Sequence, residues 1–396
     1  MLDINFIKEN KDIIKFAVQK KHLDFNVEEL IAADEERRIL VTYIEQLKKE
    51  GESSREALGK EEEKLKETIA RWQKLMIRVP NIPDISVPEG ENATKNIEVR
   101  TSGDVPKFNF EVKNAKTLLH ELDLIESSKK SSVLKNDGVM FSMALWQFVM
   151  NTFMQKNFTP IFVPTLLGRR AFLGVGQFPN NEKVLQKIDG VENFIAKDSA
   201  VGVMDICADS VFEISELPKK FISFASCEGS NFDMEQVILC EANHMTSVGL
   251  FEEAVKNIEE FLDVLKLPYQ IISHCGGDLG LAEVRKYSVE VWIPSEKVYR
   301  EMFTVAYYHD FQSRRLNMKY RDTADKTRFV HSIIGTVAAT SQLLFAIFEN
   351  HQQASGFITV PESLRKYFGK SELSQKEPIS GLDNPHFEKS EIDTTM

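Results

Sequence analysis

The stretch HSIIGTVAATSQLLFAIFEN, residues 331–350, has no acidic side chain and no lysine or arginine before Glu349, in a chain that is 28% charged. A membrane-spanning helix needs about 20 predominantly apolar residues. Small and polar residues interrupt this run at Gly335 and Thr336 and again at 340–342. We therefore predict a helix that is buried on most sides, with small residues where its backbone closely approaches a sheet or a ligand. Gln342 is then the polar residue that needs an explanation.

Composition narrows the class of protein. The chain has 396 residues, 42% of them hydrophobic, which is enough for a globular protein with more than one domain. A net charge of −11 argues against nonspecific DNA binding. The four cysteines form no CxxC pair, so we expect a reducing compartment and neither a disulfide framework nor a zinc site. The N-terminus lacks the long apolar run of a signal peptide, and we expect a cytoplasmic protein with no membrane contact.

Residues 27–79 have the pattern of two amphipathic helices. Gly51 and the ESS that follows it separate two runs of heptad-spaced apolar residues, so we predict an antiparallel helical hairpin with a tight turn. Arg37 and Glu62 occupy positions in the apolar seam, where they either disturb the packing or face each other. The seam residues are Leu30, Ala33, Leu40, Ile44 and Leu47, then Leu58, Leu65, Ile69, Trp72, Met76 and Val79.

A proline-rich linker, VPNIPDISVP at 79–88, follows the hairpin. Strand-like runs then alternate with helical runs, which predicts a large mixed sheet faced by helices in an α+β arrangement. We expect an N-terminal domain over 1–100, a main domain over 101–369 and a mobile polar tail over 370–396. The strand-like runs are 158–164, 221–226, 236–240, 269–275 and 287–294, and the helical runs are 143–156 and 250–265.

The order of these segments resembles that of bacterial-type seryl-tRNA synthetases, from the N-terminus to about residue 369. The similar phrases are MLDINFIKEN, ADEERR, VPNIPDISVP, FLGVGQFP, CGGDLG, YSVEVWIPSEKVYRE, FQSRRLNMKYRD and FVHS…FENHQQ…ITVPESLRKYFG. The resemblance implies a class II aminoacyl-tRNA synthetase fold: an N-terminal helical hairpin that reads serine tRNA, and an antiparallel sheet that activates serine with ATP in a homodimer.

The resemblance fails where the family holds ATP. Adenylation needs cations around the α-phosphate, and the family supplies arginines in its second motif, in a phrase like FRRE, and its third, in a phrase like GSGLAVGR. Here the second region, 224–244, has Ala225 and Ser226 near the arginine pair, and no arginine occurs between Arg170 and Arg285. The third-motif arginine aligns with Gln342. The resemblance therefore implies that 331–350 is the floor of a former ATP site.

The serine-binding phrases are altered as well. The Thr-Ala-Glu phrase of the family corresponds to about Lys197–Ser199, its third-motif Asn to Ile334, and its Ser-Ser-Cys-Ser-Asn run to 303–307. Glu301, which faces ATP and magnesium in the family, survives, but a partnership with Arg300 or Arg315 explains it equally well. The predicted vestigial ATP and serine pocket, with no catalytic residue and no metal, comprises Lys197, Ser199, Ala225, Ser226, Glu228, Glu301, Thr304, Gly335 and Gln342.

The hairpin carries candidate RNA contacts near its tip. Lys48, Lys49, Arg55 and Lys60 could meet a phosphate backbone, but glutamates are interleaved with them, so a solvated charged surface is the alternative. The hairpin is also several helical turns shorter than the arm of the family.

The sequence therefore predicts a degenerate paralogue of seryl-tRNA synthetase that has lost serine activation and needs no cofactor. It would act through binding, as a homodimer, to RNA, to itself, to a true synthetase or to another protein, with weak tRNA binding. The alternative is a ligase-like enzyme with a remodelled pocket for a different acid or nucleotide.

Overall fold

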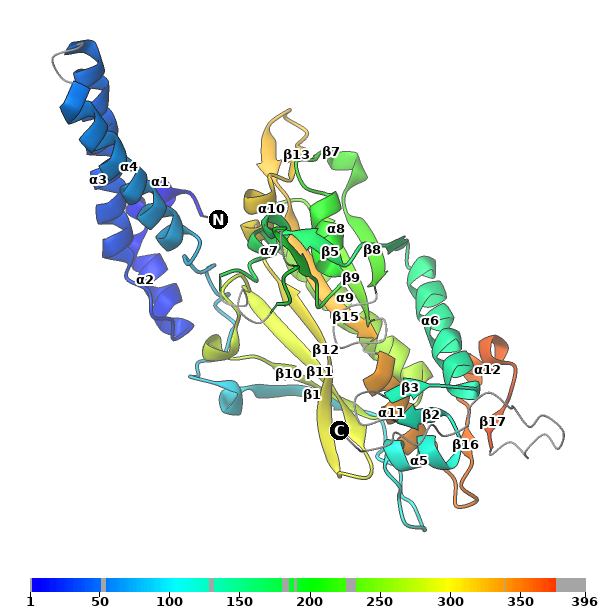
Figure 1. Cartoon of the computed structure of the whole chain (residues 1–396). Helices are drawn as coiled ribbons and strands as arrows, with labels where there is room; N and C mark the ends of the chain where they lie inside the picture. The colour runs from blue at the N-terminus through cyan, green and yellow to red at the C-terminus, as the bar shows by residue number, and fades with distance from the viewer. Residues whose placement is uncertain are drawn as a thin grey trace, which may run out of the picture.

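The computed structural model describes residues 2–50, 55–127, 132–179, 185–188, 191–225, 233–338 and 340–374. Their fold is α+β and is built on an eight-stranded sheet with the order β1-β10-β11-β12-β15-β9-β8-β4 (Figure 1). Neighbouring strands are antiparallel except β4 and β8, which are parallel. The strands are β1 (Ile97–Ser102), β4 (Thr159–Phe162), β8 (Lys219–Ala225), β9 (Asp233–Cys240), β10 (Tyr269–Ser273), β11 (Arg285–Ile293), β12 (Val298–Tyr307) and β15 (His331–Ala338).

Each face of the sheet carries its own hydrophobic core. Successive side chains of a strand point to opposite faces, and in β9 Ile238 packs into one core while Val237 and Leu239 pack into the other. The first core is closed mainly by α5 (Ala115–Glu121), α6 (Asp137–Gln155), α9 (His244–Val264), α11 (Thr340–Asn350) and α12 (Glu362–Phe368). The second core is closed by α7 (Arg169–Val175), α8 (Ala200–Ile206) and α10 (Phe311–Leu316).

Smaller sheets surround the large one. They pair β2 (Ile125–Ser127) with β3 (Ser132–Leu134), β5 (Leu166–Gly168) with β6 (Asn193–Ile195), β13 (Lys319–Arg321) with both β7 (Val211–Glu213) and β14 (Thr327–Phe329), and β16 (Ile358–Thr359) with β17 (Glu372–Leu373). All of the predicted strand-like and helical runs are confirmed as strands and helices of the core. The expected tail lies outside the described residues from 375 onward. No described helix is long and apolar enough to cross a membrane.

The predicted helical hairpin is confirmed as α3 (Val27–Glu50) and α4 (Arg55–Met76), which project away from the sheet (Figure 1). At about 1.5 Å per residue, each helix is about 35 Å long. The turn between them lies outside the described residues. All five apolar seam residues predicted in the first helix are buried. Arg37 and Glu62 do not face each other, because Arg37 stacks over Trp72 and Glu62 pairs with Lys48.

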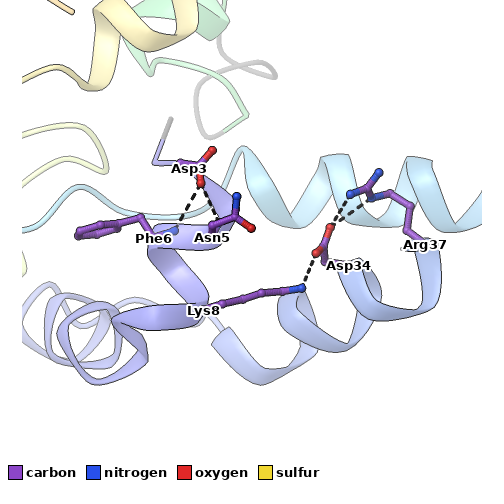
Figure 2. Close-up of polar contacts among 6 residues, drawn as sticks. All are labelled: Asp3, Asn5, Phe6, Lys8, Asp34 and Arg37. Atoms are coloured by element: carbon purple, nitrogen blue, oxygen red, sulfur yellow. Dashed lines mark hydrogen bonds and ion pairs between the residues drawn. The ribbon is translucent and has the colours of Figure 1, made fainter. Parts of the chain in front are cut away.

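The short helices α1 (Ile4–Glu9) and α2 (Lys11–Lys20) brace the base of the hairpin. Asp3 caps α1 by accepting the backbone N–H of Asn5 at 2.8 Å. The carboxylate of Asp34 in α3, 1% exposed, accepts hydrogen bonds from Lys8 of α1 and from Arg37 one turn along α3 (Figure 2). Burial opposes ionisation of Asp34, but the hydrogen bonds from Lys8 and Arg37 outweigh it and lower the pKa of Asp34. The ion pair between Lys8 and Asp34 therefore connects α1 to α3.

The prediction that 331–350 forms one buried helix is wrong for its first half. Residues His331–Ala338 form β15, a central strand, and the helix α11 begins only at Thr340. The strand contains Ile333, Ile334, Thr336 and Val337, whose β-branched side chains favour extended structure. A short apolar run of this kind cannot be assigned to strand or helix from periodicity alone, because both are buried on all sides.

Candidate functional site

A cavity of about 320 Å³ opens on the second face of the sheet, and we call it the central cavity. Four neighbouring strands form the floor of this cavity, and their register sets which side chains lie next to one another. Lys286 of β11 pairs with Ala306 of β12, Ala306 pairs with Ile334 of β15, and Thr336 of β15 pairs with Glu235 of β9. Loops and short helices above the sheet supply its walls. The wall residues include Gln177, Lys197, Asp198, Glu283, Tyr308 and Gln312.

Asp198 and Glu235 form what we call the acid pair of this cavity. The backbone N–H of Ala200 and the hydroxyl of Ser199 donate to Glu235 Oε2, at 2.5 and 3.2 Å. Asp198 accepts from the Gln177 amide at 2.7 Å and from a backbone N–H of α8. Burial, and next the charge of Asp198, raise the pKa of Glu235 well above its usual value, and burial raises the pKa of Asp198. The pair therefore holds a proton at a pH where a free carboxyl group has lost it.

Two lysines line the same cavity. Lys197 is exposed and Lys286 is half-buried. Neither side chain makes an ion pair or hydrogen bond with any other residue that the structure describes. The cavity thus combines cationic groups with an acidic pair in which Glu235 is buried and Asp198 is half-buried. Such convergent polar groups in a concave site are typical of small-molecule binding sites.

The predicted pocket residues do not all meet in this cavity. Lys197, Thr304 and Gly335 line it, whereas Glu301 and Gln342 line a second cavity of about 250 Å³, the side cavity. The side cavity also contains Arg300, which pairs with Glu296.

The suggested arginine partners of Glu301 are not its partners in the described structure. Arg300 pairs with Glu296, and Arg315 donates to the backbone carbonyls of Leu173 and Ile77. The Glu301 carboxylate lies instead 3.7 Å from Nε2 of the buried His274.

The remaining residues of the predicted pocket either pack within the protein core or lie outside the described residues. Ser199 is 1% exposed, and its hydroxyl lies 2.8 Å from that of Ser223 beneath the acid pair. Ala225 is fully buried in the second core. A Cβ at Gly335 would lie 2.9 Å from Val305 and 3.0 Å from the Thr304 carbonyl, so packing against β12 is enough to require glycine. Ser226 and Glu228 lie outside the described residues.

Sequence reasoning did not select five charged residues of the central cavity, namely Asp198, Asp233, Glu235, Glu283 and Lys286. Glu235 did carry a signal, because it is an acidic residue inside the apolar strand MEQVILC. A carboxyl group in such a strand must be buried, hydrogen-bonded or functional. Asp198 lies within the 197–199 stretch that the resemblance indicated, whereas Lys286 had no comparable signal, since its place in the cavity depends on tertiary structure.

The candidate RNA contacts are largely engaged within the hairpin. Lys48 pairs with Glu62 at 2.9 Å and Lys60 with Glu56 at 2.8 Å. Lys49 is exposed, and the side chain of Arg55 lies outside the described structure. Among the described residues, no group of three or more His, Cys, Asp and Glu side chains could hold a metal ion, and the three described cysteines are free and buried.

The antiparallel sheet with its helical hairpin defines the core of a class II aminoacyl-tRNA synthetase, and two family models agree. Residues 1–61 match the seryl-tRNA synthetase N-terminal domain, and residues 229–351 match the tRNA synthetase class II core domain (G, H, P, S and T).

Similar proteins identify the family. The chain is 30% identical to a serine–tRNA ligase of Deinococcus radiodurans over 94% of this chain and 99% of that one, and 31% identical to that of Petrotoga mobilis over 93% and 99%. A solved seryl-tRNA synthetase of Pyrococcus horikoshii, complexed with ATP, superposes with a TM-score of 0.85 at 26% identity, covering 95% of this chain and all of that one. This chain belongs to the seryl-tRNA synthetase family.

Proposed function

We propose that this member of the family has lost serine activation and acts through binding. The observation that carries the proposal is the charge of the two cavities. The described lining of the central cavity has four carboxyl side chains against two lysines, and that of the side cavity has three against one arginine. That arginine, Arg300, is already paired with Glu296. A triphosphate would enter a lining in which acidic groups outnumber cations, and like charges oppose its binding.

The sequence of the segment that the structure does not describe between β8 and β9 supports the same proposal. Residues 226–232, SCEGSNF, contain no basic side chain, so this segment cannot supply the missing cation. Each arginine–phosphate contact that is lost costs about 2 to 5 kcal/mol. Two such losses weaken nucleotide binding by about a thousandfold or more, because every 1.4 kcal/mol is tenfold.

A second function is favoured by one observation. Lys197 and Lys286 are cationic, line the central cavity and have no partner among the described residues. They could replace arginines toward a carboxylate or phosphate group, which would make the protein a ligase with a different acid substrate. We rank this function second because the acid pair and two further carboxyl groups share the cavity with these lysines.

The surface of the protein is the basis on which we propose its binding partners. A homodimer is supported by exposed apolar side chains on α6 and the adjoining strands, Met140, Met143, Phe162 and Leu166. The hairpin supports weak contact with tRNA, and a true synthetase or another protein is the other proposed partner.

Amino-acid-dependent pyrophosphate exchange tests the proposal. We expect no exchange with serine, and none after Gln342→Arg alone, because the second motif remains without an arginine. A seryl-tRNA synthetase from a relative, assayed in parallel, shows that the conditions support exchange. Exchange with serine that disappears in Glu301→Ala would overturn the proposal, and exchange with another amino acid would establish the second function.

A further inference from the structure

A further cavity, of about 510 Å³, lies between the segment 104–112 and the turn that joins β11 to β12, and it shares no lining residue with the central cavity or the side cavity. We call it the aromatic groove, because Phe108, Phe110 and Trp292 line it. The rings of Phe108 and Phe110 meet edge to face with their centroids 5.1 Å apart. Pro106, Pro294 and Lys297 also belong to its lining. Grooves lined by aromatic rings are typical docking sites for extended peptides that contain proline.

The backbone along one wall of the aromatic groove is unpaired. Residues 104–112 belong to no helix or strand, and none of their backbone N–H groups donates to an acceptor among the described residues. The next residue, Lys113, is held on both sides, because the Gln352 amide accepts from its N–H at 2.9 Å and donates to its carbonyl at 3.0 Å. Free backbone donors beside a groove favour an extended peptide, which supplies acceptors for them.

The described chain ends close to this wall. Gln352, which fastens the end of the wall, forms a β-bridge with Ile358 of β16, and Ile358 pairs with Leu373 of β17. Paired residues lie at most about 5.5 Å apart, so Leu373 lies within about 11 Å of Gln352. The description ends one residue later, and 375–396 follow. A flexible chain of about eleven residues, enough to reach Pro385, spans about 18 Å on average.

The sequence of this tail contains a segment that matches the groove. Residues 383–389, DNPHFEK, hold Pro385 and Phe387, and Phe387 is the only aromatic residue in 375–396. Proline favours an extended backbone, and phenylalanine offers a large apolar surface to other aromatic rings. We propose that 383–389 docks in the aromatic groove of its own chain, with Pro385 and Phe387 against the three aromatic side chains. This inference goes beyond the proposed function and does not depend on it.

Charge and tethering favour this occupant over others. The tail has five carboxyl side chains and two lysines, whereas the side chains of Lys107 and Lys297 are exposed at the groove and make no ion pair with any described residue. Opposite charges at the rim of a contact help to orient it. A tethered segment is present at an effective concentration of about 1 mM, which a second copy or a separate protein at micromolar concentration does not reach.

Hydrogen exchange of the full chain, measured by mass spectrometry, tests the docking. The free N–H groups of 104–112 exchange fast unless the tail covers them. With an effective concentration of about 1 mM and a dissociation constant of about 0.1 mM for the untethered contact, the tail protects these groups about tenfold. Phe387→Ser should remove the protection. Ile392→Ser, in the same tail but outside 383–389, is the matched control and should keep it.

Photo-crosslinking identifies the groove that the tail occupies. With p-benzoylphenylalanine in place of Phe387, illumination should join the tail to 104–112 or 292–297 of the same chain, and the product should keep the mass of a single chain on a denaturing gel. Phe108→Ser should remove these adducts, and circular dichroism establishes that this variant is folded. The comparison of Phe387→Ser with Ile392→Ser does not depend on that variant.

Equal exchange of 104–112 in the wild-type protein and in Phe387→Ser would overturn the inference. Adducts of doubled mass would also overturn it, because they would show that the tail reaches a second copy, and so would adducts confined to residues outside the groove. None of these measurements involves serine, ATP or tRNA. The proposed loss of serine activation is judged separately by pyrophosphate exchange, so the two failures can be told apart.

Discussion

Glu235 and Asp198 accept hydrogen bonds from consecutive backbone N–H groups at the start of α8, from Ala200 to Glu235 Oε2 and from Val201 to Asp198 Oδ1. The same turn therefore holds both carboxyl groups of the acid pair, although the two residues come from a loop and from the strand β9. Two ionised carboxylates held this way repel each other, and the pair stays partly protonated.

Glu235→Gln should change how stability depends on pH. Burial and the neighbouring Asp198 raise the pKa of Glu235, so above pH 4.5 the folded state binds more protons than the unfolded chain. The stability that Glu235 contributes is therefore present below pH 4.5 and is lost as pH rises through its folded pKa. Glutamine does not titrate, so the melting temperature of the variant relative to wild type should rise between pH 5 and pH 8.

Differential scanning fluorimetry across that pH range measures the effect. Glu362→Gln, at an exposed glutamate of α12, serves as the matched control and should follow wild type. A difference between Glu235→Gln and wild type that stays constant with pH would show that Glu235 is ionised throughout.

The helical hairpin could be predicted from sequence because its signal is local. Apolar residues recur with heptad spacing in α3, and Leu30, Leu40 and Leu47 are all buried. The contacts of Arg37 and Glu62 could not be predicted, because the seam pattern does not indicate which residue each side chain meets. Arg37 stacks over Trp72, and Glu62 forms an ion pair with Lys48. Long polar side chains reach around a seam, so their partners depend on the three-dimensional register of the helices.

The site was less predictable than the fold. The aligned motifs located Lys197, Thr304 and Gly335 at one cavity, but Glu301 and Gln342 line another. The acid pair joins residues 37 positions apart, through a loop that packs on β9, and no local pattern encodes that contact. The strand β15 was taken for a helix because a run that is buried on both faces has no periodicity to distinguish the two.

Binding of serine tRNA should be weak and should depend only slightly on salt. Lys48 and Lys60 are engaged with glutamates on the hairpin, so few cations are free to neutralise phosphates. We expect a slope of log affinity against log salt concentration of about −1 to −3, as for two or three phosphate contacts. Filter binding between about 50 and 200 mM salt, a range over which the Debye length roughly halves, measures this slope. A dissociation constant below about 1 μM at about 150 mM salt would be much tighter than typical nonspecific binding. If this affinity were lost on deleting residues 40–66, it would contradict the expectation.

The protein should be a dimer through the face formed by α6 and β4. Phe162 is 65% exposed on the edge strand β4, and Met143 is 52% exposed on α6. Covering such apolar side chains is favourable by about 25 cal/mol per Å². Phe162→Glu places a charge there and should shift the mass from dimer to monomer in light scattering. Ile85→Glu, at an isoleucine of the linker that is 95% exposed, is the control and should leave the mass unchanged. A monomeric wild-type protein at micromolar concentration would refute the proposed interface.

Lys21→Met should loosen the contact between the N-terminal helices and the core. Lys21 is 2% exposed, and its ammonium group donates to the carbonyls of Gly280, Leu281 and Glu283 at 2.8, 3.0 and 2.6 Å. Methionine fills similar space but donates nothing, and the Glu283 carbonyl would lose the donor that the described structure gives it. A buried group left unsatisfied costs about 1 to 3 kcal/mol, so we expect a loss of about 2 kcal/mol in the free energy of unfolding. Urea denaturation measures this loss. Lys15→Met, on the exposed side of α2, removes only a surface pair with Glu28 and should cost less than about 1 kcal/mol. Equal losses in the two variants would show that the three carbonyl contacts of Lys21 add no stability beyond that of a surface lysine.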